Sequence, residues 1–329
     1  HIEEIHREVT DSINYAKRIQ QAVLPDLEFG FWDLEFGSFV LFKPKDIVSG
    51  DFYWATKIIS NPQSSINNPP TADCQLPTAN LLIVTVADCT GHGVPGAFMS
   101  MLGISFLNEI VRKKEITKAS QVLNELRTSV IDALKQKGDS GEHPSTGLRV
   151  QDGMDIGLCV INVNTLEMQF AGANNPCWIV TSRQEAVGSP QLSVIARSET
   201  TKQSQIDETK DCFSDLSELT VSRNDDYQLI ELKGDKQPIG IHDYMSPFTN
   251  QVYQLQKGDT LYLTSDGFED QFGGPKHKKF LSKNMKELLK SNSQFSMPEQ
   301  KELLEKALNE WKGDGEQIDD ITVMGIKIS

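Results

Sequence analysis

The chain has 329 residues, of which 38% are hydrophobic and 24% charged, a composition typical of a globular protein that can bury one large core or two smaller ones. Its 46 acidic and 32 basic residues leave a formal net charge of −14. A surface this acidic repels phosphate backbones and anionic lipid headgroups, so we expect no nucleic-acid partner and no membrane contact by this segment.

Cysteine usage and the start of the chain bear on where the protein works. The five cysteines are widely scattered and form no C-x-x-C pair or Cys/His cluster, which favours a reducing compartment and argues against structural zinc. No apolar run approaches the roughly 20 residues of a membrane-spanning helix. We therefore expect a cytoplasmic protein. Because the chain begins with His1 rather than Met, we also expect a longer parent with an upstream sensory module, which could be membrane-anchored elsewhere.

The first two dozen residues predict a long helix that ends before Pro25. Apolar and small side chains alternate at intervals of three and four residues, at Ile2, Ile5, Val9, Ser12, Ala16, Ile19 and Val23. Such a seam is typical of a coiled coil or of a helix docked on its own domain. We keep both interpretations: a docked helix, or the seam of a parallel homodimer. Ser12 and Ala16 weaken the seam, which suits a switch. We treat residues 1–25 as a regulatory helix and 26–329 as one domain.

Strand patterns dominate the next part of the chain. Aromatic and β-branched residues predict strands over 37–44 and 50–59, and the apolar run 81–87 predicts a strand buried on both faces. Residues 60–80 between them are rich in Pro, Asn and Ser and are expected to form a polar insertion. Helical spacing then begins at Pro95, and a second helix is predicted from about Ala119 to Lys137, ended by Gly138.

The second half repeats this order of strands followed by two helices. Strands are expected over 155–163, 167–173, 177–181, 227–233, 251–256, 260–265 and 321–328, and helices over 281–290 and 297–311. Residues 183–225 form a second polar insertion without periodicity. Blocks of strands that alternate with helix pairs predict an α+β fold, a four-layer α-β-β-α sandwich of two stacked antiparallel sheets flanked by helix pairs.

Aspartates stand where extended segments end beside turns or glycines. Asp51 lies in D-I-V-S-G-D-F-Y-W, Asp88 ends an apolar run before C-T-G-H-G, Asp266 ends T-L-Y-L-T-S-D before a glycine, and Asp319-Asp320 open D-D-I-T-V. Any one of these motifs alone is typical of a turn. Asp88 is harder to explain in that way, because a charge at the edge of a core is costly unless it is paired or metal-bound. Together the aspartates predict a binuclear metal centre.

The donor set decides which metal would suit this centre. Carboxylate, carbonyl and water oxygens are the ligands that Mg²⁺ and Mn²⁺ prefer, whereas zinc and copper favour histidine or thiolate. Two such ions about 4 Å apart can share a carboxylate and a water, lower the pKa of that water and direct it at phosphorus. The pattern therefore indicates hydrolysis of a phosphate ester without a covalent enzyme intermediate.

The ordered blocks V-S-G-D-F-Y-W, V-A-D-C-T-G-H-G-V-P-G-A-F-M-S, L-T-S-D-G-F-E-D and D-D-I-T-V resemble the bacterial SpoIIE-type branch of the metal-dependent serine/threonine phosphatases, relatives of protein phosphatase 2C. The segment Y-A-K-R-I-Q-Q-A-V-L-P before them is similar to the linker helix that joins such domains to upstream signalling modules. The resemblance covers residues 13–329 apart from the two polar insertions.

The resemblance implies a role for each matching position. Asp51 would bind one metal and Asp88 would bridge both, with the backbone carbonyl of Cys89 as a further ligand. Asp266 would bind the other metal, together with one member of the Asp319-Asp320 pair. Asp319 matches the family ligand, and Asp320 would be a supporting or alternative ligand. Two Mn²⁺ or Mg²⁺ ions are implied, and a third is left open.

Other positions depart from the family pattern or allow two interpretations. Ser49 replaces a glycine that usually precedes the first aspartate. His92 invites comparison with the proton-donating histidine of the wider family, but its spacing from Asp88 differs, so we favour a role in ordering its loop and keep the proton donor as the alternative. Lys45 is expected to be either a solvated lysine or a contact for substrate phosphate. Asp155 is expected to begin a strand, with an approach to the metals as the alternative, and Asn174 would set a turn beside the site.

The resemblance also implies a substrate: a phosphorylated regulatory protein, such as an anti-sigma-factor antagonist of a partner-switching pathway. Two other functions stay open at this point. One is a catalytically silent phosphatase-fold module that dimerises and signals. The other is a metal-dependent hydrolase of small phosphate esters, although no Walker-type or dinucleotide-binding glycine motif supports nucleotide binding.

Overall fold

A computed structural model gives the structure of the protein and describes residues 2–25, 36–60, 79–136, 152–182 and 227–329. The polar insertion at 183–225, nearly all of the one at 60–80, and Gly138 lie outside the described residues.

Two five-stranded sheets form the centre of the described part of the chain. The first has the order β1 (Phe36–Lys43), β12 (Ile321–Ile328), β9 (Thr260–Thr264), β6 (Cys177–Ser182) and β7 (Tyr227–Leu232). The second has the order β2 (Phe52–Ser60), β3 (Ala79–Cys89), β4 (Met154–Asn162), β5 (Glu167–Ala173) and β8 (Gln251–Gln254). Neighbouring strands in both sheets are antiparallel.

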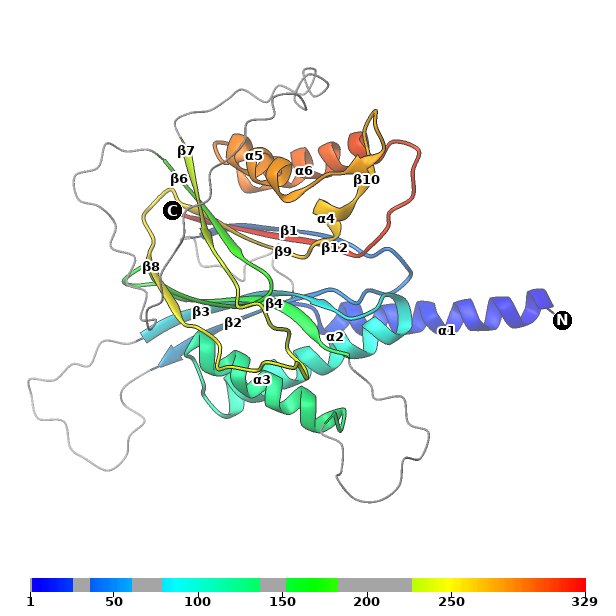
Figure 1. The fold of residues 1–329 in the computed structure, drawn as a ribbon, viewed down its shortest axis with the longest axis horizontal. Coiled ribbons are helices and arrows are strands. Elements are labelled where there is room, and N and C mark those ends of the chain that lie inside the picture. The colour runs from blue at the N-terminus through cyan, green and yellow to red at the C-terminus, as the bar shows by residue number, and fades with distance from the viewer. Residues whose placement is uncertain (1, 26–35, 61–78, 137–151, 183–226) are drawn as a thin grey trace, which may run out of the picture.

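Helices cover the outer face of each sheet (Figure 1). Next to the second sheet lie α2 (Gly93–Leu107), its π-helical continuation η2 (Asn108–Lys113) and α3 (Ala119–Ala133). Next to the first sheet lie α5 (Ser282–Asn292) and α6 (Met297–Lys312), preceded by the short α4 (Gly267–Asp270) and the hairpin β10 (Phe272–Gly273) and β11 (Lys278–Lys279). The predicted α+β arrangement of two antiparallel sheets between helix pairs is confirmed.

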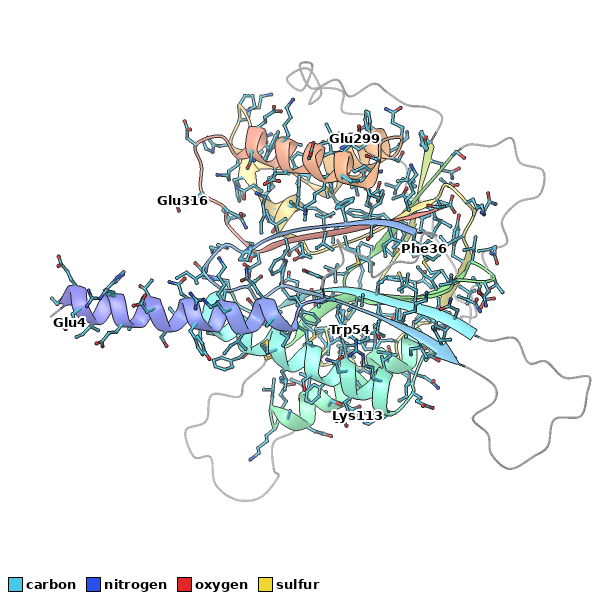
Figure 2. All side chains as sticks on the ribbon, turned by 180° about the vertical axis from the view of Figure 1, so that it is seen from behind. Glu4, Phe36, Trp54, Lys113, Glu299 and Glu316 are labelled. Atoms are coloured by element: carbon cyan, nitrogen blue, oxygen red, sulfur yellow. The ribbon has the colours of Figure 1, made fainter. Side chains whose placement is uncertain are left out.

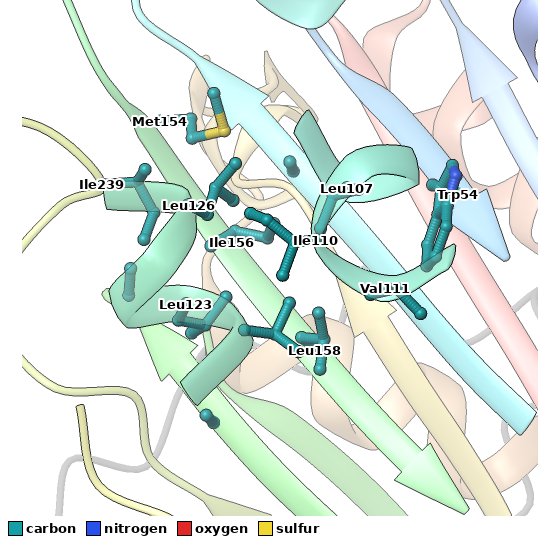
Figure 3. Close-up of a cluster of buried hydrophobic side chains, with 14 of the residues drawn as sticks. Trp54, Leu107, Ile110, Val111, Leu123, Leu126, Met154, Ile156, Leu158 and Ile239 are labelled. Atoms are coloured by element: carbon teal, nitrogen blue, oxygen red, sulfur yellow. The ribbon is translucent and has the colours of Figure 1, made fainter. Parts of the chain in front are cut away.

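Three hydrophobic clusters fill the three interfaces between these four layers. The first joins α2, η2 and α3 to the second sheet, and Figure 3 shows Leu107, Ile110 and Leu126 meeting Ile156 there. The next lies between the two sheets, where Val84 and Cys159 of one sheet meet Ile179 and Leu263 of the other. The third joins α5 and α6 to the first sheet. Each sheet is therefore buried on both faces, which explains the nearly continuous apolar run in β3.

Two of the differences between predicted and observed boundaries have a structural consequence. The strand predicted over 81–87 continues through Asp88 to Cys89, so Asp88 is part of the ladder. The helix that begins at Ala119 ends at Ala133 rather than at Lys137. Lys135 adopts a φ of 49°, its N–H donates to the Asp132 carbonyl and the next N–H, of Gln136, donates to that of Ile131. This pair of bonds is a Schellman cap, formed here without glycine at the left-handed position.

One apolar helical segment, Gly93–Lys113, is long enough to cross a membrane by length and composition, and half of it is buried inside the protein. It packs on the second sheet as part of the first hydrophobic cluster. Burial of this kind is what a core helix requires, and it accounts for the apolar character of the segment.

The helix α1 (Ile2–Val23) docks by one face near its C-terminal end and projects away from the sandwich at the other (Figure 2). Gln20 is 3% exposed, and Leu24 packs against the first hydrophobic cluster. The apolar side chains of the predicted seam do not face the domain and are open to solvent: Ile2 is 85% exposed, Val9 53% and Ile19 46%. The helix thus docks on its own domain and still presents an apolar stripe to solvent.

Candidate metal centre

Asp51 is the most deeply buried of the predicted ligands, 1% exposed at the start of β2. Its Oδ2 accepts a hydrogen bond from Thr322 Oγ1 at 2.8 Å, and its carboxylate also accepts one from the hydroxyl of Ser265. Thr322 in turn donates its backbone N–H to Ser265 Oγ at 2.9 Å. Two strands of the first sheet, β9 and β12, therefore orient a carboxylate that belongs to the second sheet.

Asp88 and Asp266 come from different sheets and face each other. Asp88 lies at the end of β3, and Asp266 follows β9 and precedes α4. Their carboxyl groups lie within hydrogen-bonding reach of each other when one of them is protonated. Asp266 is exposed and Asp88 half-buried, so this pair stands at the opening of the site and Asp51 at its buried side.

Asp320 holds the loop that carries Asp51. It is 3% exposed, its Oδ1 accepts the backbone N–H of Lys45 at 2.7 Å, and its Oδ2 accepts the backbone N–H of Gly50 at 2.7 Å. The neighbouring Asp319 accepts the Asp320 N–H through its Oδ1 at 2.9 Å. Both Asp320 oxygens are thus engaged by the protein, whereas Asp319 lies close enough to raise the pKa values of Asp51 and Asp88.

Burial and mutual repulsion raise the pKa values of these carboxyl groups. Burial is the main cause of the rise of the Asp51 pKa to about 8, with contributions from Asp320 and Asp319. Burial, followed by the charges of Asp51 and Asp266, raises the pKa of Asp88 to about 10. The pKa values of Asp266 and Asp320 are also raised, chiefly because the surrounding protein removes water from their carboxyl groups. Repulsion among these carboxyl groups is thus offset only in part, by hydrogen bonds to Asp51 and by the charge of Lys279 near Asp266.

Glycines bring the two loops of the site into contact. A Cβ on Gly50 would lie 2.4 Å from the Gly91 carbonyl oxygen and 3.3 Å from that of Cys89, and a Cβ on Gly96 would lie 2.2 Å from the Gly91 carbonyl. Neither distance to Gly91 tolerates a side chain. The Cys89 carbonyl consequently lies beside Gly50 and Asp320, at the position where the sequence predicts a backbone ligand.

His92 pairs with an aspartate outside the predicted ligand set, Asp46. Its Nδ1 lies 2.6 Å from Asp46 Oδ2, and the two side chains are 54% and 45% exposed. This pair joins the loop before Asp51 to the Gly91–Gly93 turn, which agrees with the loop-ordering interpretation. Lys45 contributes its backbone N–H to Asp320.

Asp155 lies beside the candidate site as well as near the start of a strand. It is the register partner of Asp88 in the β3–β4 ladder, and its Oδ1 accepts a hydrogen bond from Asn174 Nδ2 at 2.8 Å. Burial raises its pKa. Asn174 has a φ of 57°, a conformation that asparagine tolerates better than most residues, so the predicted turn beside the site is present.

Sequence reasoning missed three residues that orient the site: Thr322, Ser265 and Gln20. Gln20 of α1 donates its Nε2 to the Ser49 carbonyl at 2.6 Å and to Ser100 Oγ of α2 at 2.9 Å, and its Oε1 accepts the Ser49 N–H at 3.0 Å. No sequence signal separates Gln20 from the exposed Gln21 next to it. The alternation along D-D-I-T-V could have placed Thr322 on the same face as Asp320.

The donor set fits a hard divalent cation. In the part of the chain that the structure describes, no three Asp, Glu, His or Cys side chains form a closed ligand group. Whether a metal suits the site therefore depends on the chemical type of the donor atoms. The acceptors are carboxylate and carbonyl oxygens, and burial raises the pKa of the nearby Cys89 thiol, which keeps it protonated. Such oxygens suit Mg²⁺ or Mn²⁺, and a cation among them would offset the repulsion that raises the carboxyl pKa values.

Comparisons with known proteins agree with this fold. The family model described as Stage II sporulation protein E (SpoIIE) matches residues 78–195 and 217–329. A search of curated protein sequences gave no match. Among solved structures, the SiaA-PP2C domain of Pseudomonas aeruginosa is 26% identical with a TM-score of 0.68, and the match covers 99% of each chain.

Two further structures show the same fold at lower identity. The PP2C phosphatase domain with a fragment of the regulatory domain of SpoIIE from Bacillus subtilis is 17% identical, with a TM-score of 0.54 over 90% of this chain and 64% of that one. The RsbU and RsbW domains of Rv1364c from Mycobacterium tuberculosis are 15% identical, with a TM-score of 0.51 over 89% and 60%. The chain spans less than two thirds of each of these two proteins.

The buried carboxyl groups predict how stability depends on pH and metal. Folding raises the pKa of Asp88 from 3.8 to about 10, so the folded protein binds more protons than the unfolded chain and this group lowers stability as pH rises through that window. In protein treated with chelator, Asp88→Asn should raise Tm by a few degrees at pH 8 and much less at pH 5. Mn²⁺ should raise the wild-type Tm at pH 8 more than that of the variant.

Thermal unfolding followed by circular dichroism would check both effects. The exposed Asp314 provides a matched control, and Asp314→Asn should change neither. Equal shifts for Asp88→Asn at pH 5 and pH 8 would contradict this account of the buried charge.

Proposed function

The chain belongs to the SpoIIE family, and from that membership we propose that it is a metal-dependent protein phosphatase acting on phosphoserine and phosphothreonine. The observation that carries the proposal is the convergence of four aspartates from distant parts of the chain at one end of a PP2C-type fold. Aspartates that served only as turn residues would have no reason to lie close enough to repel one another.

We assign the roles in the proposed centre residue by residue. Asp51, on the buried side, would bind one ion and Asp88 would bridge two, with the Cys89 carbonyl beside them. Asp266, at the opening, would bind the second ion together with Asp319. Asp320 is a supporting residue in this scheme, because both its oxygens hold the N–H groups of Lys45 and Gly50. We propose Mn²⁺ or Mg²⁺ as the ions, since the donors are oxygens.

The chain's own residues prepare the site for phosphate ester hydrolysis. When bound, two divalent ions supply a water of lowered pKa and neutralise charge on the phosphoryl group. Thr322 and Ser265 hold the Asp51 carboxylate in one orientation, so that it would present the same oxygen atoms to an ion. Asp320 ties the Asp51 loop to β12, and the close approach of Gly50 to Gly91 brings the loop before Asp51 against the turn after Asp88.

Substitution of the central carboxylates tests the catalytic proposal. Asp88→Asn and Asp266→Asn should each lower kcat/KM for an aryl phosphate with Mn²⁺ by about 100-fold or more, because each removes a charged ligand. Steady-state assays with Mn²⁺, with Mg²⁺ and with chelator would measure this, with Asp314→Asn as the control. Wild-type turnover that survives chelator, or full activity in both variants, would contradict the proposal. A wild type that binds Mn²⁺ without turnover would favour the silent signalling module.

We propose that the substrate is a phosphorylated regulatory protein in the cytoplasm. Family membership supports this, and so do two neighbours of the same fold, one described with a regulatory domain and one with an RsbW domain in the same chain. An anti-sigma-factor antagonist of a partner-switching pathway is the candidate we favour. An upstream regulatory module in a longer parent fits the same picture.

We further propose that α1 regulates the site through its docked end. Gln20 connects three elements: α1, the Ser49 backbone two residues before Asp51, and Ser100 in α2. The same α2 begins five residues after Asp88. A rotation or withdrawal of α1 would break these bonds together and so shift both the Asp51 loop and α2 between two arrangements.

Loss of the Gln20 side chain should weaken metal binding although it touches no proposed ligand. Gln20→Ala should raise the Mn²⁺ concentration needed for half-maximal activity about tenfold, an effect typical of residues that orient metal ligands. Gln21→Ala, at the exposed neighbouring position, should have no effect. Calorimetric titration with Mn²⁺ would give the same comparison without turnover, and equal affinities in the two variants would contradict the proposed connection.

The exposed seam of α1 should hold two copies of the chain together. Ile5→Glu combined with Val9→Glu places charges on a stripe where these side chains are 48% and 53% exposed, and should shift the protein from dimer to monomer in sedimentation velocity. Arg7→Glu lies on the opposite side of the heptad and should leave the dimer intact. A wild type that sediments as a monomer at micromolar concentration would contradict the proposed homodimer.

A further inference from the structure

A lysine-rich hairpin stands out against the acid character of the protein. From Gln271 to Lys286 the chain holds five lysines and no Asp or Glu, whereas the whole sequence has a net charge of −14. The hairpin β10–β11 and its turn, which we call the lysine hairpin (Phe272–Lys279), carry three of these lysines. Lys276 and Lys278 are exposed, and neither forms an ion pair with another residue that the structure describes.

The lysine hairpin is built rigidly on the body of the protein. The N–H of Gly274 donates to the Trp311 carbonyl at 2.7 Å, and Trp311 Nε1 donates to the Gln271 carbonyl at 3.0 Å. A Cβ on Gly273 would lie 1.8 Å from the same Trp311 carbonyl. The Phe280 ring, directly after the hairpin, packs edge-on against Trp311 at 5.2 Å. The lysines are thus presented on a fixed support, so little conformational entropy would be lost on binding.

The support connects the lysine hairpin to the proposed metal centre. Phe280 also packs against Phe268 at 5.1 Å, and Phe268 lies in α4, two residues after Asp266. Lys279 Nζ pairs with Asp270 Oδ2, also in α4, at 2.7 Å, and its charge acts on Asp266 itself. Figure 1 shows β10 and α4 next to each other at one end of the first sheet. The lysine hairpin therefore borders the opening of the site on the side of Asp266.

Backbone conformation marks the end of this segment as unusual. Leu281 has a φ of 72° and a side chain that is 54% exposed, and its N–H donates to the Glu269 carbonyl at 2.7 Å. A leucine with a positive φ persists only where the surroundings impose that conformation. With Phe272, which is 44% exposed, it adds apolar surface beside the lysines, so that apolar side chains could form the centre of a contact and the lysines its polar rim.

We propose that the lysine hairpin is a docking surface for the phosphoprotein substrate, and that it selects an acidic segment near the phosphorylated residue. The inference rests on the proposed phosphatase function and adds the substrate's charge pattern to it. An acidic phosphoprotein is repelled by the rest of this surface, so a local positive field beside the site would speed its encounter and set its orientation. Lys276 and Lys278 would contact carboxylates of the substrate, and Leu281 would contact an apolar neighbour.

Binding to peptides without turnover tests the proposal directly. Fluorescent phosphoserine peptides would carry acidic, neutral or basic flanking residues, and anisotropy would be measured with wild-type protein in chelator. Lys276→Glu/Lys278→Glu should weaken binding of the acidic peptide about tenfold, since each exposed ion pair contributes modestly and reversal turns attraction into repulsion. The same variant should bind the basic peptide more tightly than wild type does.

A control variant with the same change in net charge separates the effect of the hairpin from the effect of overall charge on peptide binding. Lys113→Glu/Lys257→Glu alters two exposed lysines, one at the far end of η2 and one in the turn before β9, which ends at the site. This control should bind all three peptides like the wild type. An equal loss of affinity for the acidic peptide in both double variants, or no loss of affinity in either, would overturn the proposal. Binding of phosphatidylserine vesicles through the hairpin, with no preference among the peptides, would overturn it in favour of a membrane surface.

Activity separates this inference from the proposed function. With Mn²⁺, Lys276→Glu/Lys278→Glu should keep wild-type kcat/KM for an aryl phosphate and lose about tenfold for the acidic phosphopeptide. Absence of wild-type turnover on every substrate would contradict the phosphatase proposal while the anisotropy result still decides on docking. Equal kcat/KM of the variant and the wild type on the acidic phosphopeptide would overturn the docking role.

Discussion

The structure depends on a concentration of negative charge at the end of a hydrophobic sandwich. Asp51, Asp88 and Asp320 reach the site from the margins of three apolar strands, where burial raises the pKa of each. Such charges are tolerated only where hydrogen bonds or cations compensate them. The protein provides part of the compensation through Thr322, Ser265 and the N–H groups that Asp320 accepts, and a divalent cation is the simplest source of the rest.

This constraint explains why glycines and long-range hydrogen bonds gather around the site. The Asp51 loop contacts β12 through Asp320 and the Gly91 turn through Gly50, so three loops from separate parts of the chain form one unit. Gln20 adds α1 and α2 to the same unit. A movement of α1 would consequently act on the carboxylates through bonds rather than through a diffuse change of packing, which is the property that a regulatory helix needs.

Charge is distributed over the molecule in a way that suits a phosphorylated partner. The overall excess of acid would slow the approach of any phosphoprotein, whereas the lysine hairpin supplies positive charge at one edge of the site. Because Phe268, Phe280 and Trp311 join that hairpin to α4, the surface that would hold the substrate and the carboxylate Asp266 belong to one packed element. The fold would then hold the substrate-binding surface and the metal ligand in a fixed relative position.

The sequence by itself determined the sandwich of sheets and helix pairs and the aspartates that form the site. Strand and helix periodicities, and glycines next to carboxylates, are local signals that each segment carries alone. The tertiary structure decided which groups support those aspartates, because Thr322 and Ser265 reach Asp51, and Gln20 reaches the Ser49 backbone, across large separations in sequence. It also decided that His92 pairs with Asp46, and that α1 docks by Gln20 while its seam stays exposed. Two glutamines that are equivalent in the sequence differ only in the face of the helix on which the fold places them.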